Sequence, residues 1–187
     1  MILIRHGQTE FNRIYSATKQ DPGIRDPGLT EDGRHQAAAA AQILSQLGLR
    51  RLIASPYRRA LETAELIADA LDLPIAVDAL VAERFALSCD IGSPLAKLRA
   101  RWPRLGFDHL ADPWWPRAEE DHDSLLRRSE RFRARVAAGG ASDVAVVTHW
   151  GFIRALTGLR VPNGTVLRLD PFCPDREAEP LLMPAAC

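Results

Sequence analysis

The sequence has few cysteines and no long apolar run. Its three cysteines, Cys89, Cys173 and Cys187, are odd in number and lack the spacings of a metal site. We therefore expect free thiols and a reducing, cytoplasmic location. No apolar stretch is long enough to span a bilayer, and the first residues lack the pattern of a signal peptide, so we expect no membrane partner.

Net charge is also absent, because 24 Lys and Arg balance 24 Asp and Glu. A neutral chain offers no overall field for nucleic acid or an anionic membrane. Any anion must therefore bind at a local cluster of cations. The arginines at 127–135 fall around much of an expected helix, which favours a solvated surface over a nucleic-acid site.

Short apolar runs alternate with helical patterns along the chain. Strands are expected at 1–5, 51–55, within 74–83, at 144–148 and at 165–170. Helices are expected after the caps Thr30 and Ser55, at 123–139 and at 151–158. This alternation predicts a three-layer α/β/α sandwich around a mostly parallel sheet.

Three stretches lack the regular helix or strand pattern. Residues 12–29 hold two Asp-Pro pairs, which predicts an irregular loop, and the Pro-rich residues from 171 onward are expected to be loose. Residues 85–123 carry four prolines and three of the four tryptophans. We expect one domain over 1–187, with a cap inserted at about 85–123. The tryptophans of this cap either line a substrate site or pack the insertion.

Three of the expected strands end in side chains that suit phosphate. Arg5 and His6 follow the first strand, Arg59 lies just after the second, and His149 follows the strand at 144–148. Ligands of open α/β sheets bind beyond the carboxyl ends of the strands. Arginine matches phosphate oxygens two at a time, and a neutral imidazole is a good nucleophile toward phosphorus. Such a site needs no metal and no cofactor.

A family resemblance becomes plain at these residues. The stretch Arg-His-Gly-Gln-Thr-Glu-Phe-Asn at 5–12 resembles the Arg-His-Gly-x-Thr-x-x-Asn signature of the histidine phosphatase superfamily, the phosphoglycerate mutase-like proteins. Residues 55–64 resemble its Ser-Pro-x-x-Arg-Ala-x-x-Thr-Ala block, which makes Arg59 rather than Arg58 the phosphate-facing arginine. Further blocks, at 26–37, 80–83 and 148–151, follow in the family's order.

The resemblance implies roles for particular residues. His6 would attack phosphorus and become phosphohistidine. Arg5, Arg59 and His149 would hold the phosphoryl oxygens, and Asn12 would donate to the same phosphate. The partner would be a small phosphorylated substrate.

The sequence pattern indicates the proton donor less specifically than the phosphate-binding residues. Glu83 matches the segment that supplies the proton donor, although it could instead be a surface glutamate paired with Arg84. Asp90 is a second candidate for a polar contact, with solvation as its expected state. Trp150 stands where the family often has glycine, and its ring would either narrow the pocket, stack on the substrate or belong to the core.

The predicted function is hydrolysis of a phosphomonoester through phospho-His6. A mutase stays open because the cap carries basic residues, namely Lys97, Arg99, Arg101 and Arg104. A phosphatase of phosphohistidine proteins and a regulatory module that binds phosphate with little turnover are further alternatives. The sequence decides neither the physiological substrate nor the oligomeric state.

Overall fold

The computed structural model describes residues 1–139, 143–173 and 178–185. In chain order its elements are β1 (Ile2–Arg5), α1 (Glu10–Thr18), α2 (Glu31–Leu44), β2 (Arg51–Ala54), α3 (Arg58–Leu71), β3 (Ile75–Val77), two 3₁₀ turns (Ala79–Val81 and Ser88–Asp90), α4 (Leu95–Arg101), α5 (His122–Ala138), β4 (Val144–Thr148), α6 (Trp150–Thr157), β5 (Val166–Arg168) and β6 (Glu179–Leu182).

The strands form one sheet in the order β3-β2-β4-β1-β5-β6. The first four are parallel, while β5 and β6 run antiparallel to their neighbours. Arg5 lies opposite Thr148 in the register of β1 and β4, so these two central strands end at the same level. His6 and His149 are the next residues of the chain.

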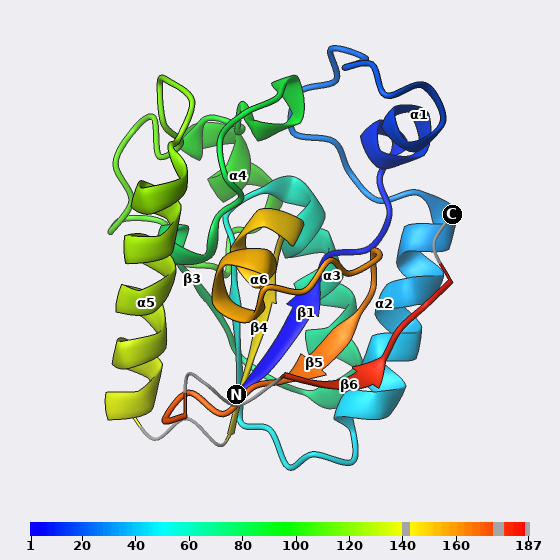
Figure 1. Cartoon of the computed structure of the whole chain (residues 1–187), viewed down its shortest axis with the longest axis vertical. Coiled ribbons are helices and arrows are strands. Elements are labelled where there is room, and N and C mark those ends of the chain that lie inside the picture. The colour runs from blue at the N-terminus through cyan, green and yellow to red at the C-terminus, as the bar shows by residue number, and fades with distance from the viewer. Residues whose placement is uncertain (140–142, 174–177, 186–187) are drawn as a thin grey trace.

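Side chains of the central strands alternate between two hydrophobic cores. Ile2 and Ile4 pack with α2 and α3, whereas Leu3 packs with α5 and α6. Figure 1 shows the resulting layers, with α5 and α6 on one face of the sheet and α2 and α3 on the other. A sheet covered on both faces needs apolar strands throughout, which explains why β4 is entirely Val, Ala and Thr. The predicted three-layer α/β/α sandwich is confirmed.

The expected loop at 12–29 is wrong at its start, because α1 occupies Glu10–Thr18. Thr9 caps this helix, and Asn12 completes a capping box with it. The helix ends at Lys19, whose backbone is left-handed with φ 58°, and both Asp-Pro pairs come after that point. Two local signals, the cap and the proline steps, thus divide one stretch into a helix and a loop.

The helix expected from Ser55 begins instead at Arg58. The Ser55 hydroxyl lies 2.7 Å from Nε2 of His149 and caps no helix. The cap pattern of Ser-Pro was therefore misleading, since the serine is used by a residue 94 positions away.

The chain beyond residue 171 is not uniformly loose, because β6 pairs antiparallel with β5. Pro180 lies in this last strand, at the edge of the sheet. Proline is tolerated there because an edge strand has one side without ladder hydrogen bonds. Cys187 lies outside the described residues.

Side chains from the predicted cap are part of the core under α3. Trp102, Phe107 and Trp114 are buried in the same cluster as Tyr57 and Leu61. The Tyr57 hydroxyl donates to the carbonyl of Asp90 over 2.6 Å, and its ring meets Trp114 edge-on at 4.6 Å. Packing thus accounts for Trp102 and Trp114, while the bounds of the cap and the single-domain organisation stay predictions. Within the described part of the chain, no helix combines the length and apolar character that a membrane crossing requires.

Candidate active site

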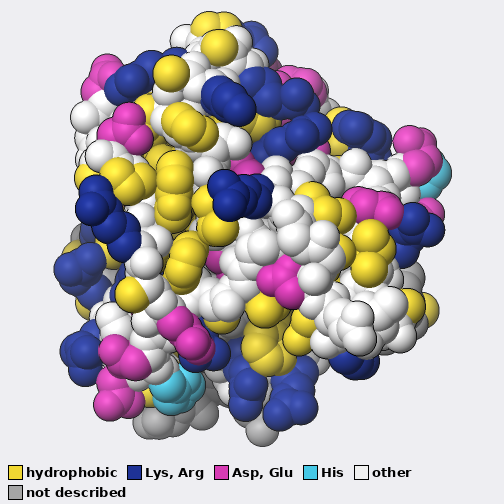
Figure 2. Space-filling view, turned by 90° about the horizontal axis from the view of Figure 1, so that it is seen from above, with side chains coloured by type: hydrophobic (Ala, Val, Ile, Leu, Met, Phe, Trp, Pro, Cys, Tyr) yellow, Lys and Arg dark blue, Asp and Glu magenta, His cyan; other side chains and the backbone are white. Residues whose placement is uncertain are grey.

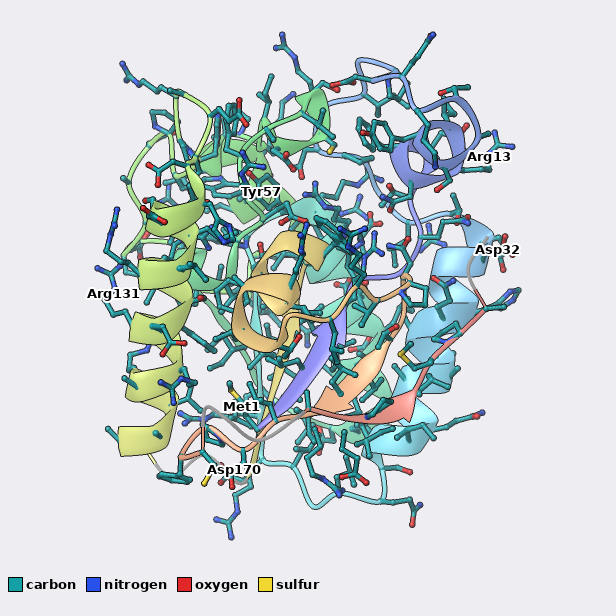
Figure 3. All side chains as sticks on the ribbon, in the orientation of Figure 1. Met1, Arg13, Asp32, Tyr57, Arg131 and Asp170 are labelled. Carbon is teal, nitrogen blue, oxygen red and sulfur yellow. The ribbon has the colours of Figure 1, made fainter. Side chains whose placement is uncertain are left out.

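The candidate site lies where β1, β2 and β4 end. His6 and His149 extend from neighbouring strands, and their ring centroids are 5.1 Å apart. Arg59 lies in the first turn of α3, just after β2. Tyr57, labelled in the upper part of Figure 3, marks this end of the molecule. The structure therefore brings together residues from three distant parts of the sequence.

His6 is held in one tautomer. Its Nδ1 lies 2.7 Å from the carbonyl oxygen of Gly7. A carbonyl can only accept, so Nδ1 carries the proton and Nε2 keeps a free lone pair. Burial, followed by the charges of Arg59 and Arg5, holds the pKa of His6 well below its usual value. The ring is neutral, as a nucleophile must be.

His149 is neutral for the same kind of reason, since burial and the nearby Arg59 hold its pKa well below the usual value. Nε of Arg59 donates to its Nδ1 over 3.3 Å. Nε2 of His149 then carries the proton and donates to the Ser55 hydroxyl over 2.7 Å. Both ring nitrogens are bonded within the site, so His149 orients Arg59 in this state.

Arg5 has one buried guanidinium nitrogen without a partner among the described residues. Its Nη1 donates to the carbonyl of Val161 over 2.6 Å. Its Nε is buried and has no acceptor among the residues that the structure describes. Burial lowers the pKa of Arg5 to about 10, against the opposing influence of the Glu83 carboxylate. The group stays charged at neutral pH, and its free donor suits an oxygen of an entering anion.

Arg59 is 3% exposed and bonds to the segment before α4 through both terminal nitrogens. Its Nη1 donates to the carbonyl of Cys89 over 2.7 Å, and its Nη2 pairs with Asp90 over 3.0 Å. The guanidinium also lies 4.3 Å from the centroid of the Tyr57 ring. These contacts fix the position of the cation.

Asp90 is 2% exposed, so its expected solvation is wrong. Besides the pair with Arg59, it accepts hydrogen bonds from the backbone of Ala86 and Leu87, at 3.1 and 3.0 Å. The carboxylate neutralises Arg59 and holds the turn against it. No local pattern around position 90 indicates this pairing, since its partner lies 31 residues earlier.

Glu83 points at the start of α6. The backbone N–H of Gly151 donates to its two carboxyl oxygens, over 2.9 and 3.2 Å, and the N–H of Arg84 donates over 2.8 Å. Burial and the negative charge of Asp90 raise the pKa of Glu83 to about 7. The alternative of an ion pair with Arg84 is wrong, because the Arg84 side chain pairs with Glu119.

Arg128 of α5 supports the loop that carries Glu83. It donates to the carbonyls of Leu80 and Ala82, over 2.7 and 2.9 Å, and forms a two-pronged ion pair with Glu120. The prediction of a solvated arginine surface is therefore wrong at this position. Arg131, one turn further, points outward from α5 as expected (Figure 3).

Asn12 and Trp150 meet at a cavity of about 340 Å³. Asn12 uses its amide oxygen within the protein, as an acceptor for Thr9 and Asn163, which leaves its NH₂ group for a ligand. Arg154 lies 5.2 Å from the centroid of the Trp150 ring. The cavity is lined by Arg5, Gln8, Asn12, Tyr15, Ser16, Gln36, Trp150, Arg160, Val161, Pro162, Asn163 and Ala185. Three predicted site residues thus line this cavity, while His6, Arg59, Glu83 and His149 are not among its lining residues.

Comparisons with known proteins identify the family. Residues 1–170 match the profile of the histidine phosphatase superfamily (branch 1). A glucosyl-3-phosphoglycerate phosphatase of Mycolicibacterium vanbaalenii is 32% identical over 183 residues, covering 89% of this chain and 78% of the relative. A probable phosphoglycerate mutase of Serratia proteamaculans is 29% identical over 149 residues, covering 79% and 67%.

Solved structures show the same fold. A mycobacterial glucosyl-3-phosphoglycerate phosphatase in complex with VO3 superposes with a TM-score of 0.65, at 24% identity, over 100% of this chain and 99% of the other. The predictions of family, fold and phosphatase class are confirmed, whereas the residue roles stay predictions. The chain belongs to the histidine phosphatase superfamily.

Proposed function

We propose that the protein hydrolyses a small phosphomonoester through a phosphohistidine on His6. The observation that carries this proposal is the state of His6. It is neutral, its Nδ1 is anchored to the Gly7 carbonyl, and its Nε2 is free, with two guanidinium groups nearby. No other buried histidine in the described residues combines a free ring nitrogen with such surroundings.

The first step forms a bond between Nε2 of His6 and phosphorus and breaks the bond from phosphorus to the ester oxygen. Arg5 and Arg59 neutralise the charge that builds up on the phosphoryl oxygens. The departing oxygen takes a proton from Glu83, whose pKa of about 7 leaves it substantially protonated near neutral pH. The alcohol leaves neutral.

The second step reverses the role of Glu83. Its carboxylate takes a proton from water, the water oxygen bonds to phosphorus, and the bond from phosphorus to His6 breaks. Inorganic phosphate leaves and Glu83 is again protonated. A carboxyl with a pKa near the working pH suits both directions of proton transfer.

The cavity beside Arg5 supports a polar leaving group. Among the described residues that line it, only Arg5 and Arg160 are charged, and both are positive. Tyr15 and Trp150 supply aromatic faces, while Gln, Asn and Ser supply neutral hydrogen-bonding groups. We therefore propose a phosphate ester rich in hydroxyl groups and bearing a carboxylate that Arg160 recognises. The name of the M. vanbaalenii relative describes a substrate of that chemistry.

A metal-free assay with an activated phosphate ester tests the catalytic proposal. Wild-type protein, His6→Ala and the surface control His35→Ala are compared for turnover and for acid-labile, alkali-stable labelling. We expect turnover and label in wild type and His35→Ala, and neither in His6→Ala. Folded wild-type protein that binds phosphate without turnover or label would leave the regulatory module instead. Transfer to a second hydroxyl without phosphate release would indicate a mutase.

A substrate panel tests the leaving-group site. For Arg160→Ala we expect KM to rise about tenfold or more for a carboxylate-bearing sugar phosphate, with little change for an uncharged ester. Arg34→Ala removes an exposed charge of α2 outside the cavity and serves as control. Equal changes for both esters would contradict the proposed recognition.

The cytoplasmic location belongs to the same proposal. Cys89 and Cys173 are free thiols, as expected in a reducing compartment.

A further inference from the structure

A second cavity lies where the loop after α1 meets α4. Its volume is about 270 Å³. It is lined by Arg25, Asp26, Arg58, Ser93, Lys97, Leu98, Arg101 and Trp102. None of the seven predicted site residues is among them. Figure 2 looks down on this end of the molecule, and Lys and Arg side chains gather on the upper half of that face.

The nearby carboxylates are already used by the protein. Asp26 is 6% exposed and accepts the backbone N–H groups of Arg58 and Ser93, over 2.9 and 3.0 Å. Glu62 lies beneath at 2% exposure, and one of its oxygens accepts from both Arg58 and Arg101, over 2.8 and 2.7 Å.

Positive charge is therefore in excess around the cavity. Arg58 and Arg101 share the single carboxylate of Glu62. Arg25 and Lys97 form no ion pair within the described ranges of the chain. Counted with Asp26 and Glu62, four cations face two anions. A ligand with two negative charges would bring the sum of these charges to zero.

The guanidinium groups are held in place before any ligand arrives. A side chain at Gly28 would come within 2.6 Å of the Arg58 guanidinium, so the absence of a Cβ there lets the group lie against the backbone. Arg101 lies 5.0 Å from the centroid of the Trp102 ring. Both arginine side chains stay reachable, at 42% and 49% exposure. These contacts reduce the conformational entropy that Arg58 and Arg101 would lose on binding a ligand.

Trp102, one of the residues that line the cavity, has an unused donor. It is 5% exposed, and its indole Nε1 is buried without a hydrogen-bond partner in the part of the chain that the structure describes. A buried N–H without an acceptor is costly.

We propose that this cavity is a second anion site, separate from the catalytic centre, which binds phosphate or the dianion of a phosphate ester without turnover. Fixed arginine forks match phosphate oxygens in pairs. Because none of the predicted catalytic residues is among the described residues that line the cavity, the bound phosphate is not the reacting one. Its ligands come from the loop after α1, from α3 and from α4, so occupancy would fasten the cap to the core.

Calorimetric titration with inorganic phosphate tests the proposal, with methylphosphonate as a probe for the ester form. Arg25→Ala/Lys97→Ala removes the two unpaired cations. Arg99→Ala/Arg104→Ala is the matched control, since it removes the same charge from α4 and the residues just after it but from outside the cavity. We expect two phosphates per wild-type chain and per control chain. The Arg25/Lys97 variant should bind one, with the second weakened at least tenfold and turnover of an activated ester unchanged within about twofold.

Each outcome of the titration supports or contradicts the second anion site. Two phosphates of unchanged affinity in the Arg25/Lys97 variant would overturn the proposal, as would a single phosphate in wild type that this variant retains. A single phosphate in wild type that this variant loses would support the second site while contradicting phosphate binding at His6. Tighter binding of methylphosphonate than of phosphate at the lost site would identify an ester as the ligand, and the reverse order would identify the free ion.

Discussion

Glu83 is the residue whose environment most directly sets the pH dependence of the enzyme. Its pKa is raised to about 7, so the protonated form that the proposed mechanism requires persists to neutral pH and is lost above it. The pKa of His6 is lowered, so the nucleophile stays neutral below pH 6.5. For an alkyl phosphate we expect kcat/KM to fall as pH rises above about 7, with no loss from His6 near 6.5.

The Glu83→Gln variant isolates that carboxyl. It should lower kcat about 10²- to 10⁴-fold and remove the alkaline fall, because the amide has no proton to lose in this range. Profiles of kcat/KM against pH for both proteins make the measurement. An alkaline fall that survives the substitution would assign it to another group.

Asp90 shows how much one buried charge depends on its partner. Asp90→Asn leaves the Arg59 guanidinium buried with no carboxylate, and we expect a loss of about 3–5 kcal/mol in the free energy of unfolding. Asp108→Asn breaks the exposed pair with Arg99 and should cost less than about 1 kcal/mol. Chemical denaturation measures both, and similar losses in the two variants would argue against the importance of burial at Asp90.

Among the elements, α2 is pressed against the turn that follows His6. A Cβ on Gly33 would lie 2.1 Å from the carbonyl oxygen of Gln8, and one on Gly7 would lie 2.2 Å from that of Gly33. That Gln8 oxygen also accepts the N–H of Thr30, over 2.9 Å. Because both facing residues are glycines, the first turn of α2 can contact the turn that follows His6.

Gly33→Ala should separate these two elements. We expect a destabilisation of about 1–3 kcal/mol from overpacking, together with a lower kcat, because the turn carrying His6 must shift. Gly106→Ala, where a Cβ meets nothing within 4 Å, is the control and should leave both quantities nearly unchanged. Denaturation and turnover assays on the Gly33→Ala and Gly106→Ala variants measure the two effects. A Gly33→Ala variant that is destabilised but keeps full kcat would show that the displacement does not affect His6.

Prediction from sequence succeeded for elements whose signals are local. β4 is a short apolar run, and Thr30 caps α2 through a hydrogen bond to Gly33. It failed where distant partners decide the outcome. β6 gains its order from pairing with β5, and the burial of Asp90 comes from Arg59. Neither partner can be read from neighbouring residues.

For the whole molecule, the shared core implies a single unfolding event. Trp102 and Trp114 of the predicted cap are buried with Tyr57 and Leu61. We expect the denaturation curve from tryptophan fluorescence, which reports mostly on the cap, to coincide with that from far-ultraviolet circular dichroism, which reports on all helices. A fluorescence transition at lower denaturant would show that the cap unfolds on its own.

The support that Arg128 gives to the Glu83 loop predicts a pattern of substitutions among related proteins. Arg128 and Glu120 are only 16% and 10% exposed, and each compensates the charge of the other. Loss of either side chain alone would leave an unpaired charge next to the loop that carries Glu83. Among relatives that keep this loop, substitutions at these two positions should therefore appear together, while the outward-facing Arg131 should vary independently.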